Sequence, residues 1–142
     1  MLDETDTKLL WMLKENARIP FLEMAKRLRI SESTIRNRVN NMEKNGIIKK
    51  YSALVEPSRI GYSVAIVGID VMPEKFLDVA KKLTEFDSVR FVATSSGDHM
   101  LMTEIWMESA SKLRDFISNE IGRIDGVTRT CPAIINEKLK EI

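Results

Sequence analysis

The sequence predicts an α+β fold in two parts: a helical N-terminal part, then a part that mixes strands and helices. Three observations support this prediction. Apolar residues in the first fifty positions recur every three or four residues, the spacing of one helix face. From residue 62 onward, runs rich in β-branched residues alternate with helical stretches. Within this second part, a short residue pattern occurs twice at a spacing of 38.

The N-terminal part is expected to begin with two short helices. Leu9 and Leu13 recur at helical spacing. Asp3 or Thr5 can cap the start of this helix, because their side-chain oxygens accept hydrogen bonds from unpaired backbone N–H groups. Pro20 suits the first turn of a second helix, where its missing N–H loses no helical partner.

A third helix is predicted within RISESTIRNRVNNMEKNG, residues 29–46. Ser31 is a good N-cap, and Ile30 can pack against Ile35 as a hydrophobic staple. Gly46 stands where a left-handed residue commonly ends a helix. A helix, a short turn and a second, capped helix form a helix-turn-helix motif.

The outer face of the third helix carries side chains suited to DNA. At about 100° per residue, the stripe opposite the apolar positions consists of Ser33, Arg36, Asn37, Asn40 and Lys44. In the major groove arginine pairs with guanine and asparagine with adenine, whereas lysine serves best on phosphates. We expect the first four residues of this stripe to read bases. The alternative is a plain three-helix bundle with a solvated charged face.

Positive charge is concentrated in the same part of the chain. The net charge is only +1, but residues 1–50 carry 11 Lys and Arg against 7 Asp and Glu, whereas residues 51–142 carry 11 against 14. A basic end on an otherwise neutral protein is typical of a polyanion site. The side chains expected to contact phosphates are Lys26, Arg29, Arg38, Lys44, Lys49 and Lys50. Arg38 lies beside the stripe, and we expect its guanidinium to reach a phosphate or a carboxylate rather than a base.

A hinge is predicted between the two parts. The segment IIKKYSALVEPSRIGY has the composition of a short two-strand segment with a turn near Pro57. Pro57, Ser58 and Gly61 are residue types that interrupt regular structure. We therefore expect a DNA-binding domain over residues 1–50, a hinge over 51–60 and a second domain over 61–142.

The second domain is expected to contain two strand–helix–strand units. Strands are predicted over residues 62–71, 88–96, 100–107 and 126–136, with helices from Pro73 to Phe86 and from Ser109 to about Ile124. Leu83–Val89 aligns with Ile121–Val127, so that each copy is the end of a helix turning into a strand. Two such units in tandem form the βαββαβ, ferredoxin-like fold, with both helices on one face of an antiparallel sheet.

The sheet is expected to be apolar on both faces. In residues 100–107, one set of alternate positions holds Leu101, Thr103, Ile105 and Met107, and the other holds Met100, Met102, Glu104 and Trp106. Helices are available to cover only one face. A second copy of the domain is the simplest cover for the other face, so the sequence predicts a homodimer whose sheets pack together.

The segment TSSGDHM, residues 94–100, combines serine, aspartate and the only histidine of the chain. A hydrolase triad needs these residue types, with the nucleophile within reach of the base and an oxyanion hole nearby. Asp98 and His99 are adjacent, however, and neighbouring residues on a strand point to opposite faces. We therefore interpret the segment as a Gly-Asp turn between two strands and expect no catalytic residues.

The chain resembles the leucine-responsive/asparagine-regulator (Lrp/AsnC, feast/famine) family of bacterial and archaeal transcription regulators over essentially its whole length. The resemblance rests on the order and spacing of short motifs: LDxxD near the start, SxxTIxxRV, MExxGII, and the SG pair at residues 96–97. It implies an N-terminal helix-turn-helix and a ferredoxin-like domain that dimerises and assembles further, up to an octamer of four dimers. It also implies that amino acids bind at subunit interfaces.

The resemblance places the effector site at the turn. The residues expected there are Ser96, Gly97, Asp98, His99 and Met100, with backbone N–H groups near Gly97 holding the ligand's carboxylate. The family turn usually has the sequence Gly-x-Tyr-Asp, and its acid helps to hold the effector. Here Met100 replaces that acid, in a form similar to archaeal members, so another acid such as Asp98 must take the ligand's amino group.

The remaining features of the composition favour a regulator of the cytoplasm. The single cysteine, Cys131, cannot form an internal disulfide, which fits a reducing compartment. No stretch is apolar and long enough to span a membrane, and we expect no metal, cofactor or enzymatic activity. The expected partner is double-stranded DNA, bound sequence-specifically. A DNA-compacting architectural protein with little base preference is the alternative.

Overall fold

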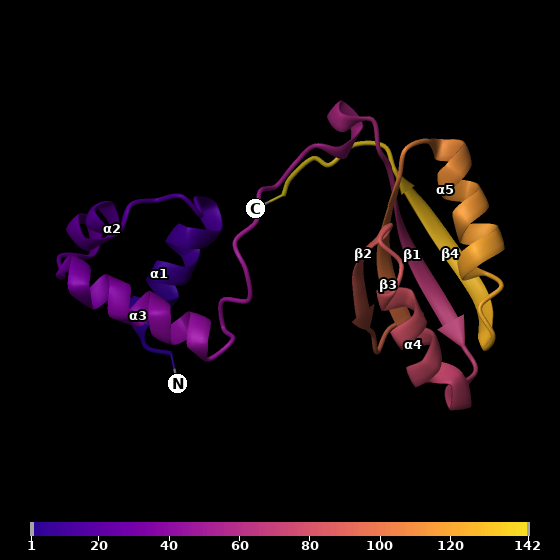
Figure 1. The fold of residues 1–142 in the computed structure, drawn as a ribbon, viewed down its shortest axis with the longest axis horizontal. Coiled ribbons are helices and arrows are strands. Elements are labelled where there is room, and N and C mark those ends of the chain that lie inside the picture. Colours follow the sequence, from indigo (N-terminus) through magenta and orange to yellow (C-terminus); the bar gives the residue numbers. More distant parts are fainter. Residues whose placement is uncertain (1, 142) are drawn as a thin grey trace. The chain divides into compact units, whose positions relative to one another are not determined.

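The computed structural model describes residues 2–141, which form two compact units. The first unit comprises the residues up to Leu54 together with Lys140 and Glu141, and the second spans Val55–Leu139. The first is helical, whereas the second combines a sheet with helices (Figure 1). The predicted α+β fold class is therefore confirmed. The division between the units falls inside the segment proposed as a hinge, whose limits stay a prediction.

Three helices make up the first unit: α1 (Glu4–Glu15), α2 (Phe21–Leu28) and α3 (Glu32–Lys44). α1 begins at a capping box. The Asp3 side chain accepts a hydrogen bond from the N–H of Asp6 at 2.8 Å, and the Asp6 side chain accepts one from the N–H of Asp3 at 3.2 Å. Asp3, rather than Thr5, is therefore the cap.

The core of the first unit joins all three helices. Leu9 on α1, Met24 on α2, and Ile35 and Val39 on α3 have no exposed surface. Their packing fixes which face of α3 turns inward, and so which face remains for a partner.

Both ends of α3 follow the signals in its sequence. Ser31 accepts a hydrogen bond from the N–H of Thr34 at 3.1 Å, and Ile30 packs against the cluster that buries Ile35. Gly46 follows the helix with a φ of 69°, the left-handed conformation expected there. The position of α3 is thus set by a cap, a staple and a terminal glycine.

The segment after α3 differs from the prediction. Residues 47–56 contain no strand, and Pro57–Ile60 form a short 3-10 helix that ends at Gly61. A strand needs a hydrogen-bonded neighbour, and among residues 2–141 nothing pairs with this segment. The prediction of two strands around Pro57 was therefore wrong for the single chain.

The second unit is a four-stranded sheet with two helices. In chain order its elements are β1 (Ser63–Val71), the 3-10 turn η2 (Pro73–Lys75), α4 (Phe76–Thr84), β2 (Val89–Thr94), β3 (Leu101–Met107), α5 (Ala110–Phe116), its π-helical continuation η3 (Ile117–Ile121) and β4 (Val127–Ile135). The strands are antiparallel in the order β2-β3-β1-β4, and α4 and α5 lie on one face (Figure 1). This is the predicted ferredoxin-like arrangement.

The sequence repeat is also a structural repeat. The N–H of Val89 donates to the carbonyl of Phe86 at 3.1 Å, and the N–H of Val127 donates to the carbonyl of Ile124 at 3.0 Å. The two bonds lie at equivalent positions of the repeat. Each copy therefore turns from helix to strand in the same way.

The two faces of the sheet have different surroundings. On the helix side Val67, Ile69 and Leu101 are fully buried beneath α4 and α5. On the other side, which we call the open face, Ile66 keeps 40% and Phe91 53% of their surface exposed. The apolar second face predicted from the sequence is thus present and uncovered in the single chain.

Strands β2 and β4 form the edges of the sheet. β4 pairs with β1 in continuous register from Val64–Ile135 to Asp70–Arg129, and Pro132 stands opposite Val67 within that register.

Candidate functional site

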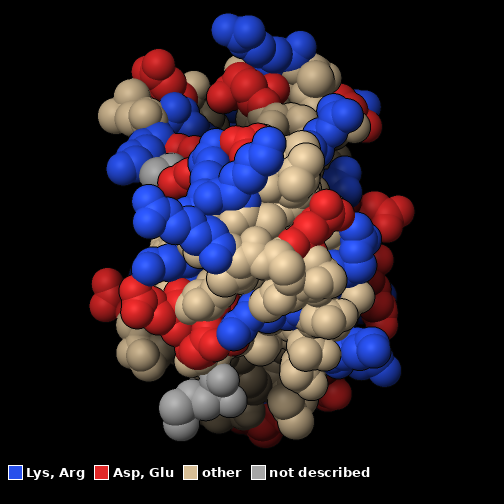
Figure 2. Space-filling model, turned by 90° about the vertical axis from the view of Figure 1, so that its left-hand side faces the viewer, with Lys and Arg blue, Asp and Glu red and all other residues tan. Residues whose placement is uncertain are grey.

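The outward face of α3 carries the side chains predicted to bind DNA. The exposed residues of the predicted set are Ser33, Arg36, Asn37, Asn40 and Lys44 on α3, together with Lys26, Arg29, Lys49 and Lys50. Figure 2 looks toward the first unit. It shows Lys and Arg side chains grouped on one part of the visible face, beside a strip of residues without charge. The structure thus leaves these side chains accessible to a partner.

The turn between α2 and α3 is tight. Arg29 has a φ of 56°, a left-handed conformation that is uncommon outside glycine and costs roughly 1–2 kcal/mol. The N–H groups of Arg29 and Ile30 both donate to the carbonyl of Ala25, which closes the turn. The exposed side chain of Arg29 is thus located in the turn just before the N-cap of α3. No sequence signal indicated this conformation.

Arg36 is in contact with two residues that the sequence analysis did not single out. Its Nη2 lies 2.9 Å from Oε1 of Glu32, and its Cζ lies 5.1 Å from the centre of the Phe21 ring. A carboxylate one turn before an arginine on the same helix is a recognisable ion-pair signal, which could have identified Glu32. Phe21 comes from α2, and no local pattern relates it to Arg36.

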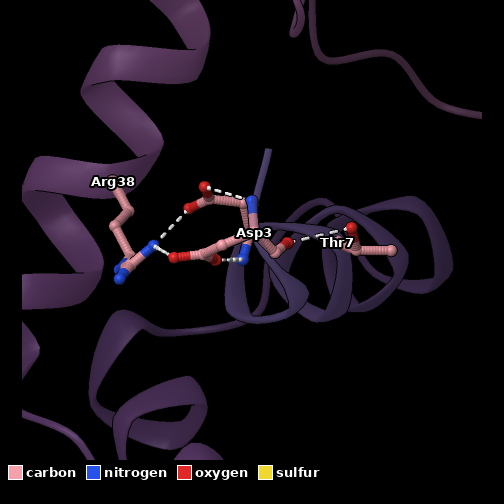
Figure 3. A network of polar contacts seen from close by, with 4 residues as sticks. Asp3, Thr7 and Arg38 are labelled. Atoms are coloured by element: carbon pink, nitrogen blue, oxygen red, sulfur yellow. Dashed lines mark hydrogen bonds and ion pairs between the residues drawn. The ribbon is translucent and has the colours of Figure 1, made fainter. Parts of the chain in front are cut away.

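Arg38 joins α3 to the start of α1. Its Nη1 lies 2.6 Å from Oδ2 of Asp3 and 2.8 Å from Oδ1 of Asp6 (Figure 3). The hydrogen bonds that Arg38 donates, first to Asp6 and second to Asp3, raise the pKa of its guanidinium. Of the two partners expected for Arg38, the structure shows the carboxylate. Both bonds use Nη1, so a phosphate contact from the other nitrogens of Arg38 stays a prediction.

Replacing Asp3 with Asn should lower the melting temperature at neutral pH, and this difference should narrow as the pH falls below about 4. The N–H of Asp6, and next Arg38, hold the pKa of the Asp3 carboxyl below its ordinary value. Such a carboxyl stabilises the fold above its unfolded pKa, and the contribution is lost as the pH falls through the folded pKa. Asn remains a good N-cap, so the variant isolates the charge. Melting curves across this pH range check the prediction; a pH-independent difference contradicts it.

The connection between β2 and β3 is a loop of residues 95–100 rather than a tight Gly-Asp turn. The N–H of Ser95 donates to the carbonyl of Met100 at 2.9 Å, which closes the loop. The N–H of Gly97 donates to Oγ of Ser95 at 3.1 Å, so this N–H is engaged within the loop; a carboxylate held by backbone N–H groups near Gly97 stays a prediction. Ser96, Gly97 and Asp98 are exposed.

His99 anchors this loop on the open face of the sheet. Its Nδ1 lies 3.0 Å from Oδ1 of Asp70 on β1, and Nε of Arg129 lies 3.3 Å from the other oxygen of that carboxylate. The His99 ring lies on Gly68, where an added Cβ would be 2.1 Å from its Cδ2. His99, like Met100, is half-buried. The predicted effector residues thus divide into an exposed group and a pair packed against the sheet.

The imidazole of His99 pairs with Asp70 and not with the adjacent Asp98. Among residues 2–141, no serine hydroxyl hydrogen-bonds to His99, and Ser95 instead accepts from Gly97. In the same residues no group of three or more His, Cys, Asp or Glu side chains is placed to hold a metal ion. The geometry of the loop is therefore that of an anchored surface segment.

Two family profiles match the sequence. One, described as winged helix-turn-helix DNA-binding, matches residues 2–49, and the other, described as the Lrp/AsnC ligand binding domain, matches residues 64–141. The chain belongs to the Lrp/AsnC family. It is accordingly a DNA-binding transcription regulator, with the helix-turn-helix formed by α2 and α3 and the ligand-binding domain formed by the second unit.

Relatives within the Lrp/AsnC family match over nearly the whole length. The HTH-type transcriptional regulator LrpA of Pyrococcus horikoshii is 52% identical over 99% of this chain and 100% of its own, and LrpA1 of Halobacterium salinarum is 40% identical over 97% and 98%. Among solved structures, PH0061 superimposes with a TM-score of 0.92 at 25% identity over 99% and 97%, and E. coli AsnC with 0.84 at 26% over 100% and 97%. No helix within residues 2–141 of this Lrp/AsnC protein has the length and apolarity to cross a membrane.

Proposed function

We propose that α3 enters the major groove and that Ser33, Arg36, Asn37 and Asn40 contact base edges. The observation that carries this proposal is the shared outward face of α3, on which all four side chains are exposed. Lys26, Arg29, Lys44, Lys49 and Lys50 supply phosphate contacts. Specificity then comes from the arginine and asparagine side chains, and sequence-independent affinity comes from the charges around them.

Replacing Arg36 with Ala should remove the preference at one base position of the operator, by roughly 1–3 kcal/mol if the contact is bidentate. Replacing Lys44 with Ala should weaken binding to all DNA sequences alike. It should also reduce the slope of log affinity against log salt concentration by about one. Selection from a randomised operator library, followed by titration at several salt concentrations, separates these effects. If the wild type shows no base preference, the protein is a DNA-compacting protein and α3 does not read bases.

We propose further that the protein acts in the cytoplasm as a homodimer, and that four dimers assemble into an octamer. The open face supports the dimer, because it carries exposed apolar side chains on the side of the sheet that α4 and α5 leave uncovered. An amino acid bound beside the loop of residues 95–100 regulates this assembly or its DNA affinity. Asp98 takes the ligand's ammonium group, since it is an exposed acid of the loop and Met100 offers no carboxylate.

Replacing Asp98 with Asn should weaken amino-acid binding about fivefold to 150-fold, because the ligand's ammonium group loses its charged partner at a cost of roughly 1–3 kcal/mol. Calorimetry of the full-length protein with each of the common amino acids measures this. Asp115→Asn, which removes the same charge from an exposed position of α5, is the matched control and should bind normally. Binding by neither wild type nor variant contradicts the effector proposal, and equal binding by both excludes Asp98.

A further inference from the structure

Three side chains from two helices meet at the start of α3. Glu32 is the first residue of α3, Arg36 follows one turn later, and Phe21 is the first residue of α2. The Arg36 guanidinium donates to Glu32 at 2.9 Å and lies over the Phe21 ring at 5.1 Å from its centre. The guanidinium is therefore held on one side by a carboxylate and on another by an aromatic face.

A carboxylate at this position opposes DNA binding by its charge. The N-terminal end of the second helix of a helix-turn-helix is the end that contacts base edges, and the surrounding phosphates repel a negative group. Glu32 is 44% exposed at its side chain, so burial against the fold does not explain its presence. Its side-chain carboxylate accepts a hydrogen bond from the Arg36 guanidinium.

The contact to Glu32 leaves Arg36 able to read a base. A guanidinium has five N–H donors in a fixed fork, and Glu32 accepts from Nη2. The remaining donors are available for the guanine edge. Ordering a long, flexible side chain on binding costs affinity, and this cost is smaller when the side chain is already held in place.

We propose that Phe21 and Glu32 are positioning residues that orient the Arg36 guanidinium before DNA arrives and thereby sharpen the preference for guanine at its base pair. This inference rests on the proposed role of Arg36 in reading a base. Glu32 lowers the affinity for DNA in general and raises the discrimination at one position. Phe21 contributes to the discrimination without a charge effect.

Glu32→Ala should reduce the guanine preference at the Arg36 position about threefold to tenfold while raising the affinity for unrelated DNA. Phe21→Leu, which keeps an apolar side chain against the core, should reduce the same preference and leave the affinity for unrelated DNA unchanged. Both are measured by selection from a randomised operator library with the full-length protein, followed by titration of single-base variants of the selected site.

Glu23→Ala is the matched control. Glu23 is also a first-turn acid paired with an arginine one turn later, Arg27, and its side chain is 46% exposed. Its replacement should leave the preference at every base unchanged. The inference is overturned if Glu32→Ala retains the full guanine preference, or if Glu23→Ala lowers it equally. If Arg36→Ala leaves the base preference unchanged, the proposed role of Arg36 in reading a base fails as well. If Arg36→Ala removes the guanine preference but Glu32→Ala and Phe21→Leu both keep it, only the positioning role fails.

Discussion

Replacing Ile66 with Lys should convert the protein from a dimer to a monomer at micromolar concentration. Ile66 lies on β1, one of the two central strands, and projects from the open face with 40% of its surface exposed in the single chain. A stable interface buries about 1,200–2,000 Å² in total. An interface of this size on the open face would extend across the central strands and cover Ile66. An unpaired ammonium group buried there costs several kcal/mol. We expect the dimer dissociation constant to rise by more than about a hundredfold.

Sedimentation of the full-length protein across a concentration series measures this change. Leu77→Lys is the matched control, because Leu77 is an exposed apolar residue of α4, on the helix side of the sheet. That variant should sediment as the wild type does. A dimer that survives Ile66→Lys would exclude the open face as the interface, and loss of the dimer in Leu77→Lys would indicate the helix face instead.

Replacing Gly68 with Ala should expel the His99 ring and release the loop of residues 95–100 from the sheet. The new Cβ would lie 2.1 Å from Cδ2 of His99, so the ring must move and its contact with Asp70 is lost. We expect a loss of stability of roughly 1–3 kcal/mol, the usual cost of overpacking. Because the chain has one histidine, its ring resonances report the displacement directly in a proton NMR spectrum.

Two further variants test the cause of this effect. An added Cβ at Gly97, in the same loop, would meet only Oγ of Ser95 at 3.5 Å, an ordinary contact, so Gly97→Ala should change stability by less than about 0.5 kcal/mol. Adding His99→Ala to Gly68→Ala removes the clash, so the double variant should be no less stable than His99→Ala alone. Unaltered His99 resonances in Gly68→Ala would show that the ring does not lie on Gly68.

Signals that act between near neighbours in the sequence predicted most of the fold. The cap at Ser31, the staple of Ile30 with Ile35, and the left-handed Gly46 each depend on residues a few positions apart. The repeat around Val89 and Val127 indicated the order of helices and strands in the second unit. The outward position of Arg36 followed from helical periodicity alone.

Contacts between distant residues were beyond the reach of the sequence. His99 and Asp70 are 29 positions apart, Arg38 and Asp3 are 35 apart, and no periodic pattern connects either pair. The prediction of two short strands around Pro57 failed for a related reason. A segment with the composition of a strand forms one only where a neighbouring strand is available to pair with it. The bond from Gly97 to Ser95 is local, but short polar loops admit many hydrogen-bonding patterns.

The proline in β4 limits how copies of this protein can associate. Its pairing register with β1 passes through Pro132 without interruption, so the proline nitrogen lies on the outer side, where a missing N–H leaves the ladder intact. A further strand added at that edge would lack a donor at this position. Growth by strand addition is therefore opposed at β4, whereas packing through the open face is not. An assembly built through the open face is therefore compatible with this edge of the sheet, whereas a sheet continued from one copy to the next through β4 is disfavoured.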